Sequence, residues 1–182
     1  MKNNHPTNHL DPETPRWFAV YTHFKREKVV ERMLRQKGIE CYLPLQKQAR
    51  KYTRKFRIVE LPLISCYLFV KITKAEYVPV LETEHVLNFV KFSRDLIAIP
   101  EEEIDLIKRI VGEGLPIEVE QGSIEEGDWV EIISGNLTGL KGRMVAKEGK
   151  NQFVVELDQL GYSIRMTLDP KLLHKLNKPV RA

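Results

Sequence analysis

The longest apolar run of the chain, Leu61–Ile72, alternates with a period of two. Its even positions carry no polar side chain, whereas its odd positions combine a serine and a lysine with two aromatic residues, Tyr67 and Phe69. Alternation of β-branched and aromatic residues predicts a central strand. One face of this strand can be buried throughout. On the other face, Tyr67 and Phe69 either pack inside the protein or contact a partner.

Helices and further strands are predicted on both sides of this run. Arg16–Thr22 alternates as a first strand, and Thr22 can cap a helix over about Phe24–Lys37 that stops at Gly38. The other predicted elements of this half are extended segments at Ile39–Leu45 and Val86–Phe92, a short helix at about Lys74–Glu82, and a helix that begins at Pro100 and ends at Gly112.

Short β segments separated by glycines follow from Gly127 onwards. Five are predicted, at about Asp128–Ser134, Leu140–Lys147, Gln152–Leu157, Ser163–Thr167 and Lys171–Leu176, and so many short strands indicate a small barrel. The segment before them is rich in glutamate and contains Pro116 and Gly122, which is typical of a linker. The chain is therefore divided into a disordered tail (1–15), a first domain (16–112), a linker (113–124) and a second domain (125–178).

Charge is distributed unevenly, although the net charge is only +4. Between His23 and Arg57 there are twelve basic and three acidic residues, whereas between Glu101 and Glu131 there are two basic and eleven acidic ones. The basic part contains a predicted helix face with Lys25, Lys28, Arg32 and Arg35, and the segment Gln46–Arg57, in which Lys51, Arg54 and Lys55 belong to a set of six bases with Tyr52 and Phe56 between them. Such surfaces either bind a nucleic acid or are a solvated helix face and a flexible loop.

Several classes of function find little support in the sequence. Two cysteines, Cys41 and Cys66, are too few for a four-ligand zinc site. Both lie in apolar segments and are expected to be buried free thiols, with a disulfide as the alternative. No apolar stretch has the length of a membrane span or opens the chain as a secretion signal does, so a cytoplasmic location is expected. No residue set has catalytic spacing, and we expect no enzymatic activity, no metal and no cofactor.

Three motifs together resemble the NusG family of transcription elongation factors. The first is Trp17–Thr22, followed by Glu27 and Lys28 in the next helix. The second is Leu61–Val70, a proline-leucine segment that leads into Tyr-Leu-Phe-Val. The third resembles a KOW motif and consists of Gly127–Ile132 with Gly135, Gly139, Lys141, Gly142 and Arg143.

The resemblance implies an α+β fold: an N-terminal NGN domain, in which helices flank an antiparallel sheet, linked to a small all-β KOW barrel of the Tudor or SH3-like type. It implies that the NGN domain binds the clamp helices of the RNA polymerase β′ subunit, stabilises the closed clamp and reduces pausing or termination. Further implied contacts are the β gate loop, near Tyr77–Val80, and the upstream or non-template DNA. The protein is expected to act as a monomer without membrane association.

The family's functional residues map onto three sets of positions. The clamp-helix set is Tyr21, Leu63, Ile64, Tyr67, Phe69, Phe92 and Ile104. The nucleic-acid set is His23, Lys25, Arg26, Lys28, Arg32 and Arg35, to which the basic segment adds Lys51, Arg54 and Lys55. The KOW partner loop, which in the family contacts ribosomal protein S10 or Rho, is Asn136, Leu137 and Leu140.

The basic segment and the polar N-terminal tail resemble those of specialised members of the family, of the RfaH or UpxY type, that act at particular operons. Some specialised members refold the KOW domain into a helical hairpin. Here Val154, Val155, Ile164 and Thr167 favour strands, so that refolding is not expected. The alternative function is that of a ribosomal-type RNA-binding protein built on the KOW domain.

Overall fold

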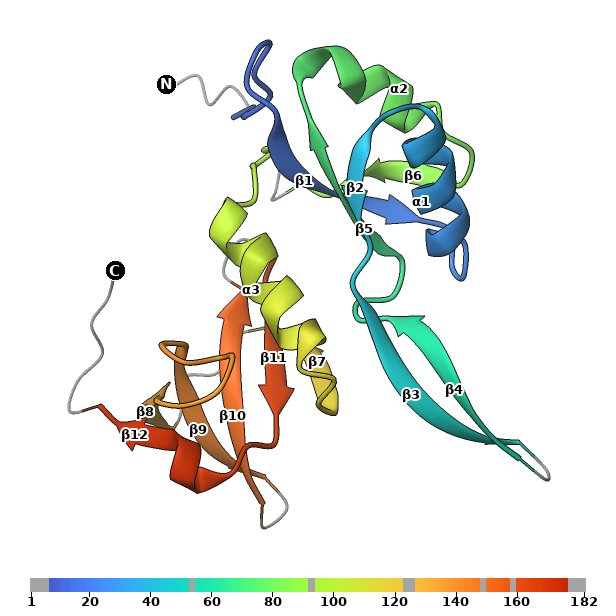
Figure 1. Cartoon of the computed structure of the whole chain (residues 1–182). Coiled ribbons are helices and arrows are strands. Elements are labelled where there is room, and N and C mark those ends of the chain that lie inside the picture. The colour runs from blue at the N-terminus through green and yellow to red at the C-terminus, as the bar shows by residue number, and fades with distance from the viewer. Residues whose placement is uncertain are drawn as a thin grey trace. The chain divides into compact units, whose positions relative to one another are not determined.

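The computed structural model of the chain describes residues 7–52, 55–91, 94–122, 127–147, 150–157 and 160–176. Contacts divide the chain into two compact units, which are considered separately (Figure 1). The first comprises residues 1–45 and 60–105, and the second comprises 46–59 and 106–182. Sheets with a few helices account for both units, in agreement with the predicted mixed fold.

The first unit contains a four-stranded antiparallel sheet in the order β2-β5-β1-β6. Its strands are β1 (Arg16–Thr22), β2 (Glu40–Tyr42), β5 (Tyr67–Ile72) and β6 (Val86–Phe89). The helices are α1 (Glu27–Gln36), the 3₁₀ turn η1 (Lys74–Glu76) and α2 (Tyr77–Leu81). Thr73 and Glu76 form a capping box at the start of η1. The first predicted strand has the expected bounds, because it alternates over its whole length.

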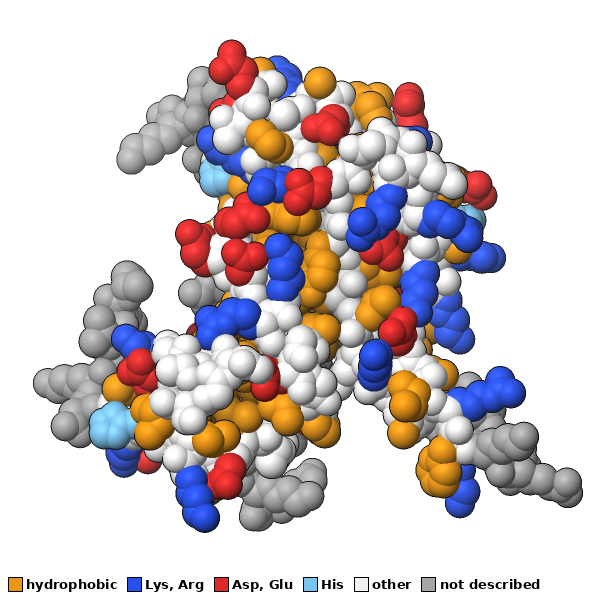
Figure 2. Space-filling model, in the orientation of Figure 1, with side chains coloured by type: hydrophobic (Ala, Val, Ile, Leu, Met, Phe, Trp, Pro, Cys, Tyr) orange, Lys and Arg blue, Asp and Glu red, His pale blue; other side chains and the backbone are white. Residues whose placement is uncertain are grey.

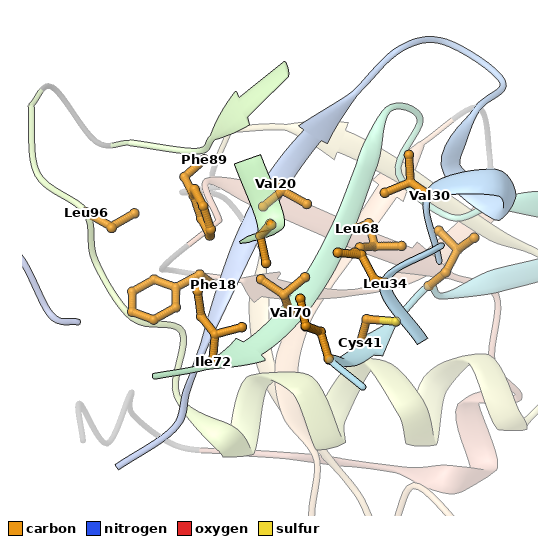
Figure 3. Packing of buried hydrophobic residues seen from close by; sticks show 13 residues of the cluster. Phe18, Val20, Val30, Leu34, Cys41, Leu68, Val70, Ile72, Phe89 and Leu96 are labelled. Atoms are coloured by element: carbon orange, nitrogen blue, oxygen red, sulfur yellow. The ribbon is translucent and has the colours of Figure 1, made fainter. Parts of the chain in front are cut away.

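One face of this sheet, which we call the core face, packs against α1 and α2 (Figure 3). Its members are buried aliphatic and aromatic side chains. The central ones are Phe18 and Val20 of β1, Leu68, Val70 and Ile72 of β5, Val30 and Leu34 of α1, Val80 of α2, Cys41 of β2 and Phe89 of β6. The even positions of the apolar run that belong to β5 therefore face a core, as predicted.

Helix α1 begins three residues later than predicted. Lys25 has a backbone φ of 61° in the left-handed region, and Arg26 is the N-cap residue without a capping side chain. Thr22 does not cap the helix, because it remains part of β1 and its hydroxyl donates to the carbonyl oxygen of His23 at 3.3 Å. The connection from β1 to α1 is thus a tight turn that presents its side chains outward.

The run Leu61–Ile72 is not one continuous strand, which corrects the prediction. Strand β4 (Lys55–Pro62) ends at Pro62, a turn follows, and β5 begins at Tyr67. Cys66 ends this turn with a φ of 66°, which the chain's alternating pattern gave no reason to expect. Strands β3 (Leu45–Tyr52) and β4 form a separate two-stranded sheet, which we call the β3–β4 hairpin and which contains the described residues of the basic segment.

The described part of the N-terminal segment is not a disordered tail. The backbone of His9 donates to Leu96 at 2.9 Å, and the backbone of Thr7 donates to the Asp95 carboxylate at 2.6 Å. The backbone of Lys74 donates to the carbonyl oxygen of Asp11, and Leu10 packs against the core. The prediction rested on polarity and proline content, which do not reveal hydrogen bonds to distant backbone. Residues 1–6 lie outside the described part of the chain.

The second unit contains a six-stranded sheet in the order β12-β8-β9-β10-β11-β7. The strands are β7 (Ile117–Gln121), β8 (Asp128–Ile132), β9 (Lys141–Lys147), β10 (Lys150–Leu157), β11 (Tyr162–Met166) and β12 (Leu173–Lys175), and the 3₁₀ turn η2 (Pro170–Leu172) precedes β12. The five predicted strands are present, and the region consists of strands rather than a helical hairpin. Among the described residues the sheet is open, with β12 and β7 at its edges.

Part of the predicted linker is a strand. Ile117–Gln121 forms β7 and pairs with β11, where Met166 lies opposite Ile117 and Arg165 opposite Glu118. Arg165 is largely buried and pairs with Glu120 at 2.9 Å. One of the glutamates that suggested a linker, Glu120, therefore pairs with a largely buried arginine that lies 45 residues further along the chain.

Two further features of the fold agree with the sequence. Helix α3 (Glu101–Gly112) follows Pro100, and Ile104, Ile107 and Ile110 are buried along it. Gly142 on β9 lies where a Cβ atom would collide with the carbonyl oxygen of Val154, which explains why a glycine is needed at this point of the KOW-like motif.

Candidate functional site

Strand pairing assembles a second face on the four-stranded sheet, which we call the aromatic face: Trp17, Ala19 and Tyr21 of β1 with Tyr67, Phe69 and Lys71 of β5. The register places Tyr21 opposite Tyr67 and Ala19 opposite Phe69. Because facing residues of antiparallel strands lie on the same side of a sheet, these side chains are neighbours. Three members of the predicted clamp-helix set, distant in sequence, are thereby brought together.

Two tyrosine hydroxyls meet on the aromatic face. Tyr21 and Tyr67 are hydrogen-bonded through their hydroxyl groups, and their rings pack edge to face with centroids 4.6 Å apart. Tyr42 of β2 stacks on Phe69 with centroids 6.4 Å apart, and burial raises the pKa of Tyr42 to about 12. The face is therefore apolar but carries polar atoms at defined points, as aromatic contact surfaces often do.

The turn before β5 is held by a buried carboxylate. The backbone N–H of Cys66 donates to Oε1 of Glu27 at 2.8 Å, and the backbone N–H of Thr22 donates to the Cys66 carbonyl oxygen at 2.9 Å. Glu27, in the first turn of α1, is only 4% exposed. These bonds fix the turn that carries Leu63 and Ile64, two further members of the clamp-helix set, both buried. Sequence reasoning missed this role of Glu27, although the residue belongs to the first family motif.

The start of α3 is tied to the aromatic face by an ion pair. Lys71 Nζ lies 2.8 Å from Glu101 Oε2 and 5.7 Å from the centre of the Trp17 ring. The hydrogen bond with Glu101 raises the pKa of Lys71. Ile104, one turn further along α3, is fully buried. Phe92, the last member of the clamp-helix set, lies outside the described residues.

The clamp-helix set is mostly buried. Tyr67 is 6% exposed and Phe69 is not exposed at all, while Tyr21 is half-buried. Such a surface can bind apolar side chains of a partner only when it becomes accessible. Burial therefore does not decide whether Tyr67 and Phe69 belong to a core or to a contact surface, the two alternatives that the sequence left open.

The predicted nucleic-acid residues around α1 are all exposed. They are His23, Lys25, Arg26, Lys28, Arg32 and Arg35. Two of them have acidic partners: Arg35 pairs with Glu31 at 2.9 Å, which raises the pKa of Arg35, and Lys28 lies 3.7 Å from Glu60. The Lys25 ammonium lies 5.0 Å from the centre of the Phe24 ring. These residues lie in the β1–α1 turn and on exposed positions of α1, and we call them the basic strip.

His85 adds to this strip without a signal in the sequence. Its backbone has a φ of 71°, its carbonyl oxygen accepts from the backbone N–H of His23, and the two imidazole rings pack edge to face with centroids 6.0 Å apart. On the β3–β4 hairpin, Lys51 is exposed. Arg54 lies outside the described residues, and of Lys55 only the backbone in β4 is described.

The KOW partner loop joins β8 to β9 and is held by an arginine of α3. Asn136 is exposed, Leu137 is only 4% exposed and Leu140 is half-buried. The guanidinium of Arg109 donates to the carbonyl oxygens of Asn136 at 3.0 Å and of Thr138 at 3.1 Å. Two polar backbone groups of the predicted partner loop are therefore already bound within the second unit.

The described residues were compared with the requirements of a metal site, a reactive thiol and a membrane-spanning helix. Among these residues, no cluster of three or more His, Cys, Asp or Glu side chains is arranged to hold a metal ion. Cys41 and Cys66 are free thiols, as predicted, but only Cys41 is buried, whereas Cys66 is half-buried. Burial raises the pKa of Cys41 to about 11. None of the described helices is long and apolar enough to cross a membrane.

Comparison with known proteins places the sequence in a family. The family model described as NusG, transcription termination factor nusG, matches residues 15–108. The chain is similar in structure to NusG of Thermotoga maritima, solved in a study of its domain interaction, with 21% identity, a TM-score of 0.56, and coverage of 90% of this chain and 98% of that one. A similarity was also found to the MjSpt4:Spt5 complex, with 19% identity, a TM-score of 0.32, and coverage of 90% and 99%.

Among curated proteins, no match was found. The match to T. maritima NusG supports the fold, and the family model spans more than half of the 182 residues and includes both the Trp17–Thr22 and the Leu61–Val70 motifs. Members of this family act in transcription and are not enzymes. The chain therefore belongs to the NusG family of transcription elongation factors.

Proposed function

We propose that this protein binds the clamp helices of the RNA polymerase β′ subunit through its aromatic face and the adjoining turn. The observation that carries the proposal is the register that places Tyr21 opposite Tyr67 beside Phe69. Leu63, Ile64, Ile104 and Phe92 complete the contact. Each large apolar anchor buried in an interface contributes about 1.5–3 kcal/mol, so a few of them suffice for a specific contact.

Binding at the clamp changes elongation without any chemical step. A ligand that binds the closed clamp more tightly than the open clamp shifts the polymerase towards the closed state. The closed state elongates with less pausing and less termination. The effect on transcription therefore depends on the difference in affinity for the two clamp states.

The buried state of the aromatic face sets a condition on binding. Tyr67 and Phe69 contact a partner only in those molecules in which the face is accessible. The apparent affinity is lowered by the fraction of molecules in that state. Polymerase binding and exposure of the aromatic face are thus coupled.

Two nucleic-acid contacts accompany the polymerase contact. The basic strip along α1 binds phosphates of the upstream or non-template DNA, and the hairpin adds Lys51, Arg54 and Lys55. Tyr77–Val80 contacts the β gate loop, and the exposed Val78 supports this assignment. Together these contacts orient the domain across the DNA cleft.

The KOW partner loop binds a second protein, ribosomal protein S10 or Rho. Asn136, Leu137 and Leu140 would make that contact after the Arg109 hydrogen bonds are released. The basic hairpin favours a specialised, operon-directed role of the RfaH or UpxY type. The protein acts as a cytoplasmic monomer in this proposal.

Transcription through a terminator tests the proposal. Purified polymerase would be assayed with and without the protein on templates with different leader sequences. Increased read-through on one leader supports a specialised regulator, and a uniform increase supports a general factor. No change on any leader, combined with RNA binding, would instead support the ribosomal-type RNA-binding alternative.

A further inference from the structure

The β3–β4 hairpin exposes two large apolar side chains to solvent. Phe56 is 73% exposed and Ile58 is 75% exposed, the highest values among the large hydrophobic residues of the described chain. Because side chains alternate along a strand, both lie on the same face of β4. An isolated exposed hydrophobic residue is ordinary, but two neighbours on a narrow two-stranded hairpin form a projecting apolar edge.

The segment that carries this apolar pair is basic. From Gln46 to Val59 the sequence contains six basic residues and no acidic one. Of these, Lys47, Lys51 and Arg57 are described and exposed. Figure 2 shows basic and hydrophobic side chains together along this hairpin. The next acidic residue, Glu60, is close to Lys28 of α1, at 3.7 Å. Basic and exposed apolar side chains on one hairpin suit a partner that is anionic and also offers a flat apolar surface.

We propose that the hairpin binds unpaired bases of a single-stranded nucleic acid, with Phe56 stacked on a base, Ile58 packed beside it, and the cations on the phosphates. Unpaired bases provide both an apolar flat surface and a negatively charged backbone. In a duplex the base faces are already stacked, so Phe56 could reach them only by unstacking a step. The inference rests on the proposed function, since the same hairpin supplies cations to the nucleic-acid contact, and it adds the bases as the point of contact.

Base stacking and phosphate contact respond differently to salt. Loss of a phosphate contact reduces the slope of log affinity against log salt concentration, because fewer counterions are released. Loss of a stacking residue lowers affinity at every salt concentration and leaves that slope unchanged. The two kinds of side chain can therefore be assigned by one titration series.

The test uses the full-length protein and a fluorescently labelled, roughly 12-nucleotide DNA of mixed sequence, as a single strand and as a duplex, followed by anisotropy at several salt concentrations. We expect Phe56→Ala to weaken single-strand binding about tenfold or more with an unchanged salt slope, and Ile58→Ala to weaken it less. Lys51→Ala should reduce the slope. Ile133→Ala, which truncates another exposed apolar side chain, serves as the matched control and should change nothing.

Other outcomes would overturn the inference. If Phe56→Ala and Ile58→Ala bind as the wild type does while Lys51→Ala is weakened, the bases are not contacted, although the proposed nucleic-acid contact stands. Equal loss on the duplex would refute the preference for a single strand. Loss of polymerase binding with unchanged DNA binding would make the hairpin a protein contact. Binding of a β′ clamp-helix fragment, measured in parallel, shows separately whether the proposed polymerase contact holds.

Discussion

The two faces of β5 are both buried but differ in chemistry. On the core face, Leu68, Val70 and Ile72 are fully buried among hydrocarbon side chains. On the aromatic face, Tyr67 and Phe69 are buried almost as completely, yet they lie beside a pair of tyrosine hydroxyls and the Lys71 ammonium. The two sets of side chains belong to one strand six residues long.

This difference shows that burial alone does not distinguish a core from a contact surface. A permanent core has no need of hydroxyl and ammonium groups, which must find partners when they are buried. A surface that is exposed in one state and covered in another benefits from such groups, because they remain hydrated when the surface is open. This contrast is consistent with our proposal, in which the core face provides stability and the aromatic face binds a partner.

The largest effect is expected on the core face. Leu68→Ala should lower the free energy of unfolding by about 2–5 kcal/mol, because it removes a fully buried side chain and leaves a cavity. Urea unfolding followed by circular dichroism measures this. A loss well below 1 kcal/mol would mean that the core face is not rigidly packed. The proposed difference between the core face and the aromatic face would then be wrong.

A smaller loss is expected for the turn that connects the hairpin to β5. Glu27→Ala should cost about 1–3 kcal/mol, because it leaves the buried N–H of Cys66 without its acceptor. Glu27→Gln keeps an acceptor oxygen and should cost less. If both variants are equally stable, the carboxylate does not hold the turn. Urea unfolding of the two variants side by side gives the answer.

The aromatic face also predicts a pH dependence. The pKa of Tyr42 is about 12 in the folded protein, against 10.0 for the free side chain. Below pH 10 both states are neutral and stability is unaffected. Above it the unfolded state ionises first, so stability falls as pH rises towards 12, by about 1 kcal/mol within the first pH unit. Tyr42→Phe should lack this loss. Since both proteins keep Cys41, their difference isolates Tyr42, and parallel curves would contradict the assignment.

The smallest effect is expected for the ion pair between Lys71 and Glu101. Both side chains are partly exposed, at 24% and 47%, so Glu101→Gln should cost at most about 1 kcal/mol. The cost should shrink in about 1 M salt, where screening is strong. Thermal unfolding at low and high salt measures both values. A cost that is large and independent of salt would show that Glu101 acts through packing instead.

Local patterns predicted much of the fold. Alternation and helical periodicity identified β1, α3 and five of the strands of the second unit, β8 to β12, because these depend on neighbouring residues. The errors have a common cause in contacts over long sequence distances. The turn at Cys66 depends on Glu27, β7 depends on its pairing with β11, and the N-terminal segment depends on the backbone of Leu96. The pattern placed Tyr67 and Phe69 on one face but could not say whether that face is covered.

The most direct test compares the two faces in one binding experiment. Wild type, Tyr67→Ala and Leu68→Ala would be titrated with a fragment of the β′ clamp helices, and their stability would be measured under the same conditions. The account predicts that Tyr67→Ala loses about thirtyfold or more in affinity while it remains folded, whereas Leu68→Ala is less stable but binds within about threefold of wild type. Affinity losses that simply follow the losses in stability of both variants would contradict it.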